Sequence, residues 1–530
     1  MILQGKRVAL PPAPVVHHRF EANAAATPDA LAVVRAGEHM TYAQLDAAAN
    51  RFAHYLIRRG HGRGAKVGLC LDYSFDLLVA LLGTLKAGAA YVPFDPAYPA
   101  ARLEQLLGQV PDLALIVASE ATAPMVAAAT VDVVDLERLA DTLDRLPATS
   151  PGTEVTGDDL CYAVFTSGST GTPKLTAVRH EGWFNLMNWL TLEYGLHSGS
   201  HHLVVSAFGF DLSQRALMTP LFCGATQHFM ASRNFDAMMA YRILNERDIR
   251  VVHCASSTLY VLVDWETARG GDALTRLDYV LFGGEALKPE RLSHWMRREG
   301  NTCTLLHQYG VAECTDVATS YDLSAYRPGH HAIAPVGRPA YNTDIHLLDA
   351  ELRGVAPGES GEICIAGAGV GAGYLGGSGP ENAKFTTVEI DGVPVRLYRT
   401  GDRGHIDASG ELVVAGRMDA QVKVRGMRID PTDIERALGR LPGIREAAVA
   451  VTHSAAGEAE LTAFLVPTRH ELTEDDVRSR LLRELPRNMV PARFVNILRL
   501  PLSPHGKVDR AALVASLEKH QVLQPSGTAA

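Results

Sequence analysis

Hydrophobic positions along the first 415 residues alternate between helical and extended spacing. Apolar residues between Thr41 and Gly60 recur every three or four positions, which predicts an amphipathic helix capped by Thr41. A strand at Val67–Leu71 and a helix at Phe75–Lys86 follow. Short apolar runs between helices are typical of parallel strands buried on both faces. The pattern therefore predicts an α/β fold whose later strands are Leu203–Phe208, Val251–Cys254 and Val280–Phe282.

The pattern changes after Gly376, where glycines and short extended pieces dominate. The run Gly416–Asp419 interrupts it, and a compact α+β segment follows. We predict the strands and helices of this segment at Gln421–Val424, Pro431–Leu438, Ala447–Thr452, Leu461–Val466 and Glu474–Leu485. A chain of 530 residues is too long for one hydrophobic core, since single cores stop growing at about 250–300 residues. We therefore expect a large N-terminal domain of layered sheets and helices, residues 1–418, and a small mobile α+β C-terminal domain, residues 419–530.

Composition and charge limit the classes of partner. Apolar residues make up 47% and charged residues 21% of the chain, as in ordinary soluble globular proteins. The formal net charge of -9 argues against nucleic acid or an anionic membrane as partner, because both require a basic surface. No stretch resembles a signal peptide or reaches the roughly 20 apolar residues that span a bilayer. Seven scattered cysteines without a CxxC pair indicate reduced thiols, so the expected location is cytoplasmic.

The densest chemical signal is the run from Tyr162 to Lys174, YAVFTSGSTGTPK. Its small residues allow several backbone N–H groups to surround an anion, and its hydroxyls add donors. Lys174 supplies a positive charge at the end of the run. A Walker A loop is excluded because Pro173 stands where its second glycine would be. The predicted phosphate-binding residues are Thr166, Ser167, Gly168, Ser169, Thr170, Gly171 and Lys174.

This run resembles the phosphate-binding loop of the adenylate-forming superfamily, which includes acyl-CoA synthetases, luciferases and nonribosomal peptide synthetase adenylation domains. The other blocks of that family are present in order along the chain. They are Leu85–Pro93, Phe210–Ser213, Tyr309–Glu313, Gly361–Ile363, Tyr398–Asp402, Gly416–Asp419 with Gln421–Gly426, and His505–Arg510. On these blocks the chain is identified as a member of the superfamily, similar to a free-standing amino acid adenylation domain.

The resemblance implies a reaction in two halves. A carboxylate attacks the α-phosphorus of ATP to give an acyl-AMP and pyrophosphate, and a thiol then takes the acyl group. Lys174 would hold the β- and γ-phosphates, and Glu313 would bind Mg²⁺. Asp402 would accept hydrogen bonds from both ribose hydroxyls. Lys507 would bridge the attacking carboxylate and the AMP, stabilising charge that builds in the transition state.

Three further residues complete the site that the resemblance implies. Tyr309 would pack on the adenine ring, and Arg417 would contact the ribose. Asp419 corresponds to the hinge about which the small domain rotates, which would withdraw Lys507 and admit the thiol acceptor. The sequence departs from the family at Ala312, which deletes a hydroxyl placed near the phosphates. Isolated charged residues are ordinarily solvated, so the surrounding blocks alone favour these roles.

Asp211 bears on the kind of acid that is activated. In the amino-acid-activating branch, an aspartate in this block pairs with the substrate ammonium. A fatty or aryl acid would leave this carboxylate buried without a cationic partner, which is costly. The structural alternative is that Asp211 caps the helix that follows it.

The remaining pocket positions that the resemblance implies indicate a polar substrate side chain, since a hydrocarbon would leave their polar groups unsatisfied. Arg215 and His253 favour a carboxylate or amide, as in Asp, Asn, Glu, Gln or a derivative. Asp316 favours a basic or hydroxylated side chain, or it pairs with Arg215 and neutralises it. A nonstandard or β-amino acid also stays open. These pocket positions are Leu212, Arg215, His253, Leu281, Gly283, Gln308, Asp316 and Val317.

The ends of the chain bear on its partners. Twenty residues follow Arg510, too few for a carrier domain, and we expect no condensation domain before Phe20. The expected thiol acceptor is therefore the phosphopantetheine of a separate carrier protein. An MbtH-like helper protein accompanies some relatives, and nothing in this sequence requires one. The rival enzyme is an acyl- or aryl-CoA synthetase, and the rival of another class is an inactive ligand-binding scaffold.

Overall fold

The computed structural model describes residues 1–166, 173–327, 333–376, 381–390, 392–418, 421–424, 426–454, 458–468, 473–501 and 508–521. These residues fold into two compact units. The first contains Met1–Ala97, Leu106–Thr166 and Lys174–Met418. The second contains the described residues beyond Met418, together with Tyr98–Gln105.

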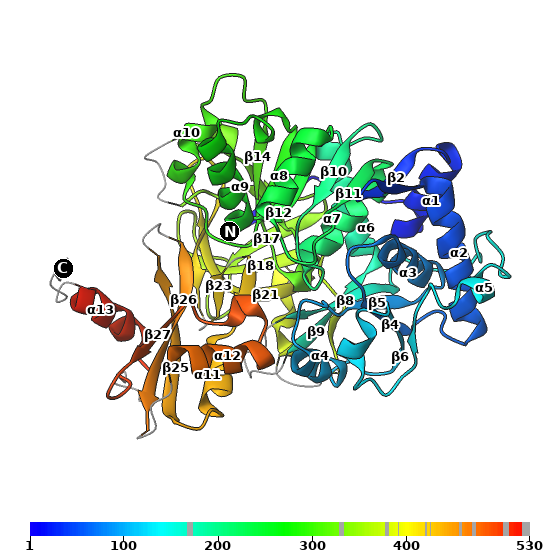
Figure 1. Ribbon diagram of the computed structural model, residues 1–530. Helices are drawn as coiled ribbons and strands as arrows, with labels where there is room; N and C mark the ends of the chain where they lie inside the picture. Colours follow the sequence, from blue (N-terminus) through cyan, green and yellow to red (C-terminus); the bar gives the residue numbers. More distant parts are fainter. Residues whose placement is uncertain are drawn as a thin grey trace. The chain divides into compact units, whose positions relative to one another are not determined.

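The first unit is built on three sheets, of which the largest has nine strands among the described residues (Figure 1). Their order is β16-β15-β14-β13-β12-β10-β11-β2-β3, and neighbouring strands from β14 to β2 are parallel. The α/β architecture predicted from the sequence is therefore confirmed. The strands of this sheet are β2 (Leu31–Arg35), β3 (Glu38–Thr41), β10 (His201–Val204), β11 (Thr226–Phe229), β12 (Val251–Ala255), β13 (Tyr279–Gly283), β14 (Thr304–Tyr309), β15 (Thr319–Asp322) and β16 (Arg338–Pro339).

Successive residues of these parallel strands face two different hydrophobic clusters, because side chains alternate across a strand. Val252 and Phe282 pack in the cluster that contains residues of α8 and α9. Val204 and Leu281 pack in the cluster that contains residues of α6 and α7. The nine-stranded sheet therefore lies between two helical layers, and every second strand residue faces α7 (Figure 1).

Two further sheets complete the first unit. The seven-stranded sheet contains β4 (Lys66–Cys70), β5 (Ala90–Pro93), β6 (Leu113–Ala118), β7 (Val133–Val134), β8 (Leu160–Thr166), β9 (Lys174–Arg179) and β19 (Gly373–Leu375). The six-stranded sheet contains β1 (Ile2–Gln4), β17 (Thr343–Leu348), β18 (Gly361–Gly367), β20 (Phe385–Ile390), β21 (Val393–Ile406) and β22 (Leu412–Arg417).

The helices of the first unit begin where the sequence provides caps. The Thr41 side chain accepts from the Gln44 N–H, and the Gln44 side chain accepts in return from the Thr41 N–H, so α2 starts with a capping box. The predicted helix at Phe75–Lys86 is confirmed with the same bounds. The helices are α1 (Val16–Ala26), α2 (Tyr42–Arg58), α3 (Phe75–Lys86), α5 (Ala140–Leu143), α6 (His180–Glu193), α7 (Asp211–Cys223), α8 (Ala237–Glu246), α9 (Ser256–Arg269) and α10 (Ser293–Met296). A further helix, α4 (Ala100–Leu107), is divided between the two units.

The prediction of a strand through Phe208 is wrong, because β10 ends at Val204. Beyond it the backbone carbonyls bond to side chains instead of to a neighbouring strand. Tyr73 donates to the Ser206 oxygen at 2.8 Å, and Gln214 donates to the Phe208 oxygen at 2.8 Å. These bonds lead the chain out of the sheet and into α7, where Asp211 begins the helix.

The second unit contains a two-stranded sheet and a three-stranded sheet with helices. The predicted α+β character of this segment is confirmed. Its elements are β23 (Val422–Val424), β24 (Met427–Ile429), α11 (Pro431–Gly439), β25 (Ile444–His453), β26 (Ala459–Pro467), α12 (Glu474–Glu484), β27 (Arg493–Asn496) and α13 (Arg510–Gln521).

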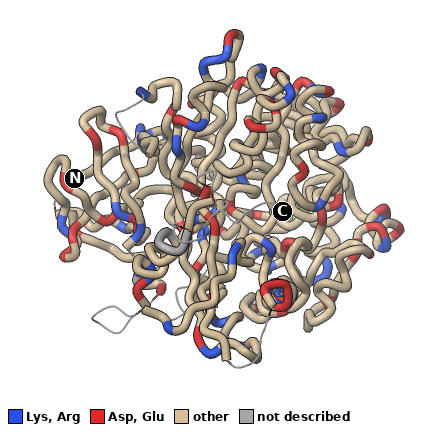
Figure 2. The backbone as a smooth tube through the Cα atoms, turned by 60° about the vertical axis from the view of Figure 1, so that its left-hand side comes forward, with Lys and Arg blue, Asp and Glu red and all other residues tan. Residues whose placement is uncertain are grey.

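Basic and acidic residues are interleaved along the described backbone of both units (Figure 2). Across the described ranges, every helix is too short or too polar to cross a bilayer.

Lys86 is a buried cation between helices of the first unit. Its side chain is 0% exposed, and its Nζ lies 2.5 Å from Glu21 Oε1 and 2.8 Å from Asp46 Oδ1. Lys86→Met would leave two carboxylates facing an apolar core without their cation. We expect a loss of about 2 kcal/mol, less than for a fully buried pair because each carboxylate is about a quarter exposed. Guanidinium denaturation would measure this as a lower midpoint.

Lys66→Met provides the control, because Lys66 is only partly buried at the start of β4. Its denaturation midpoint should stay within error of the parent. Equal midpoints for both variants would contradict the stabilising role assigned to Lys86.

Candidate active site

The segment from Gln308 to Val317 turns sharply after β14. Gly310 makes the turn possible, because a Cβ there would lie 1.8 Å from the Asp316 carbonyl oxygen. Thr315 and Asp316 both have left-handed backbones, with φ of 60° and 68°. Left-handed geometry is unfavourable for a β-branched residue such as Thr315. The turn therefore stores strain that its hydrogen bonds must offset.

Hydrogen bonds hold this turn closed. The Ala318 N–H donates to the Tyr309 oxygen at 2.8 Å, which joins the two ends of the turn. The Thr315 hydroxyl donates to the Gly369 oxygen at 2.7 Å. Gly182 leaves room for that hydroxyl, since a Cβ there would lie 2.9 Å from Thr315 Oγ1. The turn thereby places Gln308, Tyr309, Glu313, Asp316 and Val317 on one short stretch of chain.

Tyr309 belongs to a buried polar network with β21 and β22. Its hydroxyl donates to Asp402 Oδ2 at 2.8 Å, and Arg417 donates to Asp402 Oδ1 at 2.7 Å. Asp402 and Arg417 are direct partners in the antiparallel pairing of β21 with β22. Burial and the neighbouring Asp402 raise the pKa of the Tyr309 phenol, so it stays a donor at neutral pH. The structure thus brings together three residues that are separate in the sequence.

A second polar network contains Lys174 and Glu313. The Tyr374 hydroxyl donates to Glu313 Oε1 at 2.6 Å, and Lys174 Nζ lies 5.3 Å from the centre of the Tyr374 ring. Lys174 Nζ also lies 3.4 Å from Glu381 Oε1. Thr166 stands directly opposite Lys174 in the pairing of β8 with β9, and its Oγ1 is buried without a described hydrogen-bond partner. A cation, a carboxylate and a hydroxyl therefore gather beside the predicted phosphate loop.

Tyr374 is a site residue that sequence reasoning missed. It joins the two networks, because its hydroxyl also lies 3.0 Å from the hydroxyl of Tyr398, on the strand that carries Asp402. Its neighbours Gly373 and Leu375 form only a three-residue strand, which gives no periodic pattern. The available signal was a tyrosine within a glycine-rich stretch.

The predicted substrate pocket is assembled from α7 and the facing sheet. Asp211, Leu212 and Arg215 lie within the first turns of α7. His253, Leu281, Gly283 and Gln308 occupy alternate strand positions on the sheet face toward α7. Gly283 has no room for a side chain, since a Cβ there would lie 2.1 Å from the Gln308 oxygen.

Arg215 connects the helix, the sheet and the turn. Its Nε lies 2.6 Å from Asp316 Oδ2, and its Nη1 donates to Gln308 Oε1. Both charged side chains are buried, at 1% and 10% exposure. Burial raises the pKa of the Asp316 carboxyl to about 7, although Arg215 acts in the opposite direction. The sequence left open a pairing of Arg215 with Asp316, and the structure forms it.

Asp211 is the first residue of α7, and Phe210 is its N-cap. One carboxylate oxygen of Asp211 accepts the Leu212 N–H at 2.8 Å. The structural alternative predicted for Asp211 therefore has support from this contact. The side chain is only partly buried, and it lies near enough to Asp316 to raise the pKa of that carboxyl.

His253 is 1% exposed, and both of its ring nitrogens lack a hydrogen-bond partner among the described residues. Burial, with Arg215 and His202 close by, holds the pKa of His253 well below its usual range. The ring is therefore neutral at physiological pH. A buried neutral imidazole with unpaired nitrogens is a candidate ligand contact.

Several predicted site residues lie outside the described residues. They are Ser167, Gly168, Ser169, Thr170, Gly171, Asp419 and Lys507.

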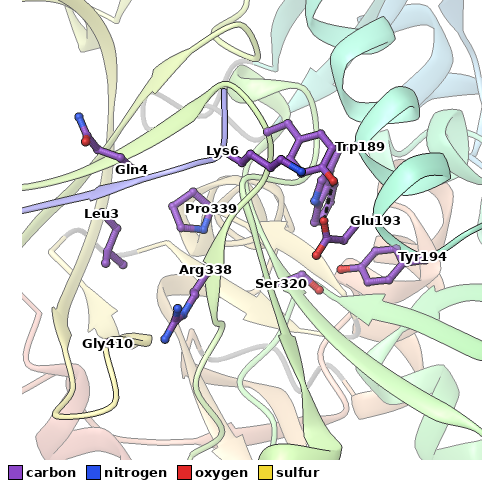
Figure 3. A pocket seen from close by; sticks show the side chains of 11 residues that line it. Leu3, Gln4, Lys6, Trp189, Glu193, Tyr194, Ser320, Arg338, Pro339 and Gly410 are labelled. Atoms are coloured by element: carbon purple, nitrogen blue, oxygen red, sulfur yellow. Dashed lines mark hydrogen bonds between the residues drawn. The ribbon is translucent and has the colours of Figure 1, made fainter. Parts of the chain in front are cut away.

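An open pocket of about 490 Å³ lies elsewhere in the first unit (Figure 3). Trp189, Glu193 and Tyr194, from the end of α6, line one side, and Arg338 and Pro339 line the other. None of the predicted site residues lines this pocket.

His17, His18 and Glu21 form a group that could hold a metal ion, with ligand atoms within 4.8 Å of one another. Lys86 Nζ lies 2.5 Å from Glu21, and this fixed positive charge opposes a cation there. Glu313 is the more suitable carboxylate, since it is buried beside the predicted phosphate loop.

Comparisons with known proteins agree with this geometry. The family model "AMP-binding enzyme" matches residues 20–375, and "AMP-binding enzyme C-terminal domain" matches residues 433–507. Syringomycin synthase SyrB1 of Pseudomonas syringae pv. syringae is 34% identical over 524 residues, covering 96% of this chain and 83% of that protein. The chain therefore belongs to the AMP-binding enzyme family, and the predicted resemblance is confirmed.

Within that family the chain is an ATP-dependent, AMP-forming ligase of the nonribosomal peptide synthetase adenylation type. It is 34% identical to the dimodular nonribosomal peptide synthase of Bacillus subtilis (strain 168) over 510 residues, which is 94% of this chain and 21% of that protein. The chain thus spans about a fifth of that relative. A solved structure of holo-PA1221, described as a protein with adenylation and PCP domains bound to a vinylsulfonamide inhibitor, has 28% identity and a TM-score of 0.80, covering 95% of this chain and 84% of that one.

Gly310→Ala tests the turn that carries the site. The new Cβ would meet the Asp316 oxygen, so the turn must open. We expect a loss of about 3 kcal/mol, measured as a lower denaturant midpoint. Gly62→Ala is the matched control, because its Cβ would meet only the Ala87 oxygen at an ordinary 3.5 Å. A Gly310→Ala midpoint as high as the control would show that the close approach is unimportant.

Proposed function

We propose that this enzyme activates an amino acid with a polar side chain. It would form an aminoacyl-AMP and pyrophosphate from ATP, and then load the aminoacyl group onto the phosphopantetheine thiol of a separate carrier protein. The observation that carries this proposal is the pocket between α7 and the sheet, where Arg215, His253, Gln308 and Asp316 are all buried and polar. A hydrocarbon acid would leave these groups without partners.

The nucleoside would bind at the Tyr309 network. Asp402 offers two carboxylate oxygens to the two ribose hydroxyls, which would replace or share the present bonds from Tyr309 and Arg417. Arg417 keeps Asp402 ionised and oriented, and would itself contact the ribose. The Tyr309 ring would pack on adenine.

The phosphates would bind beside Lys174 and the run from Thr166 to Gly171. Lys174 supplies positive charge, and the buried Oγ1 of Thr166 is available as a donor. A site for Mg²⁺ fits Glu313, because magnesium favours one or two carboxylates combined with phosphate oxygens. When bound, the ion would neutralise phosphate charge. Tyr374 would orient the Glu313 carboxylate through its hydrogen bond.

Lys507, Asp419 and the carrier protein enter this proposal through the family resemblance. Lys507 would stabilise charge on the attacking carboxylate and the AMP. Asp419 would be the hinge that exchanges Lys507 for the thiol acceptor. The acceptor would be a carrier domain, as the adenylation and PCP domains of the PA1221 title suggest. An MbtH-like protein remains an optional partner.

The charges around Arg215 favour a neutral polar side chain on the substrate. Asp211 would pair with the substrate ammonium, so Arg215 and Asp316 would neutralise each other. A substrate carboxylate would have to displace Asp316 from Arg215, and a substrate cation would have to displace Arg215 from Asp316. Either exchange breaks a buried ion pair, which is costly. Of the candidates Asp, Asn, Glu and Gln, this argument favours the amides.

An acyl- or aryl-CoA synthetase is the second candidate. The bond from the Leu212 N–H to Asp211 favours it, because a capping role would explain the aspartate without any ammonium. Buried polar groups in the side-chain pocket favour the amino acid.

Asp211→Asn separates these two functions through ATP–pyrophosphate exchange. With amino acids, the loss of the ammonium partner should lower kcat/KM about a hundredfold. The neutral amide keeps the shape of the side chain, so exchange with des-amino acids should stay as low as in the parent. Asp29→Asn, at an exposed position, changes net charge equally and should have no effect. Exchange in the parent with des-amino acids alone would establish the CoA synthetase reading.

Substrate preference should also depend on pH through Asp316. Because burial raises its pKa to about 7, Asp316 is mostly protonated at pH 6 and mostly ionised at pH 8. Ionised Asp316 neutralises Arg215, whereas protonated Asp316 leaves Arg215 free to pair with a substrate carboxylate; Asp211 is the other charge facing this carboxyl. The ratio of exchange rates for an amide substrate over its acid counterpart should therefore rise from pH 6 to pH 8. The same slope in Asp316→Asn, where this group no longer titrates, would rule out Asp316 as the cause.

A further inference from the structure

His202 is a buried histidine beside the substrate pocket that sequence reasoning did not single out. It lies on β10, 0% exposed, and its ring stacks on His253 with centroids 5.7 Å apart and planes 22° apart. Pairing of β10 with β12 puts His202 opposite Val251 and Val204 opposite His253. His202 is therefore a diagonal neighbour of His253 on the same sheet face.

Hydrogen bonding fixes which nitrogen of His202 carries the proton. The Ser200 hydroxyl lies 2.7 Å from the His197 carbonyl oxygen, which can only accept, so Ser200 donates there. Ser200 Oγ also lies 3.2 Å from His202 Nε2. The single hydroxyl proton is already used, so His202 Nε2 must donate to Ser200 Oγ. His202 Nδ1 is then a bare acceptor, and no described group bonds to it.

Neutrality of the ring agrees with this assignment. Burial lowers the pKa of His202 to about 3, with the nearby His201 and His228 acting in the same direction. A second proton on Nδ1 is therefore excluded at physiological pH.

Gln308 has an equally definite orientation. Arg215 has only donors, so the Gln308 atom that it contacts must be the carbonyl oxygen. This leaves Gln308 Nε2 as a donor, and within the described chain it has no partner. His253 is neutral and adds one donor and one acceptor, since neither ring nitrogen is bonded.

The unpaired groups therefore number two acceptors and two donors. The acceptors are His202 Nδ1 and one nitrogen of His253, and the donors are the other nitrogen of His253 and Gln308 Nε2. All three side chains are at most 2% exposed, so bulk water does not satisfy them. Leaving such atoms unpaired would cost free energy that a matching ligand recovers.

We propose that the amino acid bound here ends in a terminal carboxamide, as in a side-chain amide or ureido group, and that His202 is a specificity-determining residue for it. This inference rests on the adenylation function proposed above. The two N–H donors of a CONH₂ group match the two acceptors, and the two lone pairs of its oxygen match the two donors.

Other side-chain groups fit less well. A carboxylate has no proton to give to His202 Nδ1 or to the acceptor nitrogen of His253. An ammonium has no acceptor for Gln308. A hydroxyl has one donor and leaves one of the two acceptors unpaired. A hydrocarbon leaves all four groups unpaired.

The test is ATP–pyrophosphate exchange with matched substrates: asparagine against aspartate, glutamine against glutamate, and citrulline against ornithine and norvaline. In the parent, one carboxamide or ureido substrate should exceed its partners at least tenfold in kcat/KM. His202→Phe keeps a planar ring and removes the acceptor. It should lower kcat/KM for that substrate about tenfold and leave the hydrocarbon norvaline unchanged.

His346→Phe is the matched control. His346 is also buried, at 3% exposure, with both ring nitrogens unpaired, but it lies on β17 of another sheet. It should leave the substrate ratios unchanged. His202→Asn puts an amide oxygen near the Nδ1 position and should restore part of the preference.

Each result decides the matter. A preferred substrate with a carboxylate, ammonium or hydrocarbon side chain overturns this inference and leaves amino acid adenylation intact. A uniform loss over all substrates in both His202→Phe and His202→Asn makes His202 a structural residue and also overturns its role. Exchange with des-amino acids alone removes the proposed function together with this inference.

Discussion

The contact between Gly310 and the Asp316 carbonyl is the constraint on which the candidate site depends. Because Gly310 has no side chain, the chain can fold back on itself within seven residues of β14. The fold-back requires left-handed backbones at Thr315 and Asp316, which are unfavourable unless the surroundings hold them. The bond from the Thr315 hydroxyl to Gly369 provides part of that support. One short stretch of chain thereby contributes to the nucleoside network, the phosphate network and the side-chain pocket.

Burial gives these polar groups their chemical character. Asp402 is held by two donors, and Glu313 is held by Tyr374, so each carboxylate has a fixed direction before any ligand arrives. Preorganised charges of this kind need little rearrangement when a nucleotide binds. In the side-chain pocket, the pairing of Arg215 with Asp316 removes the largest charges from recognition. Discrimination then depends on hydrogen bonds from neutral groups, which can distinguish an amide from an acid of the same shape.

Sequence patterns predicted the local structure well where caps and periodicity were clear. The capping box at Thr41 and the apolar spacing through Lys86 fixed two helices of the first unit closely. The strand expected to reach Phe208 failed, because side chains of Tyr73 and Gln214 bond to the backbone there, and these residues are distant in sequence or in the next helix. Such bonds leave no trace in hydrophobic periodicity.

The candidate site shows the same division. Glu313, Asp402 and Arg417 were predicted from motifs, and the structure places Asp402 and Arg417 in one network. Tyr374 and His202 were missed, because each acts through a neighbour that only the fold brings close. The pairing of Arg215 with Asp316 stayed an alternative in the sequence, since nothing in the spacing of residues 215 and 316 fixes their distance.

The most direct test is a crystal structure with a hydrolysis-resistant aminoacyl-sulfamoyl adenosine carrying the preferred side chain. The account predicts ribose hydroxyls on Asp402, the ammonium on Asp211, and the side chain between α7 and the strands that carry His253 and Gln308. An analogue bound with its ribose away from Asp402, or with its ammonium away from Asp211, would contradict the assignment of this site to amino acid adenylation.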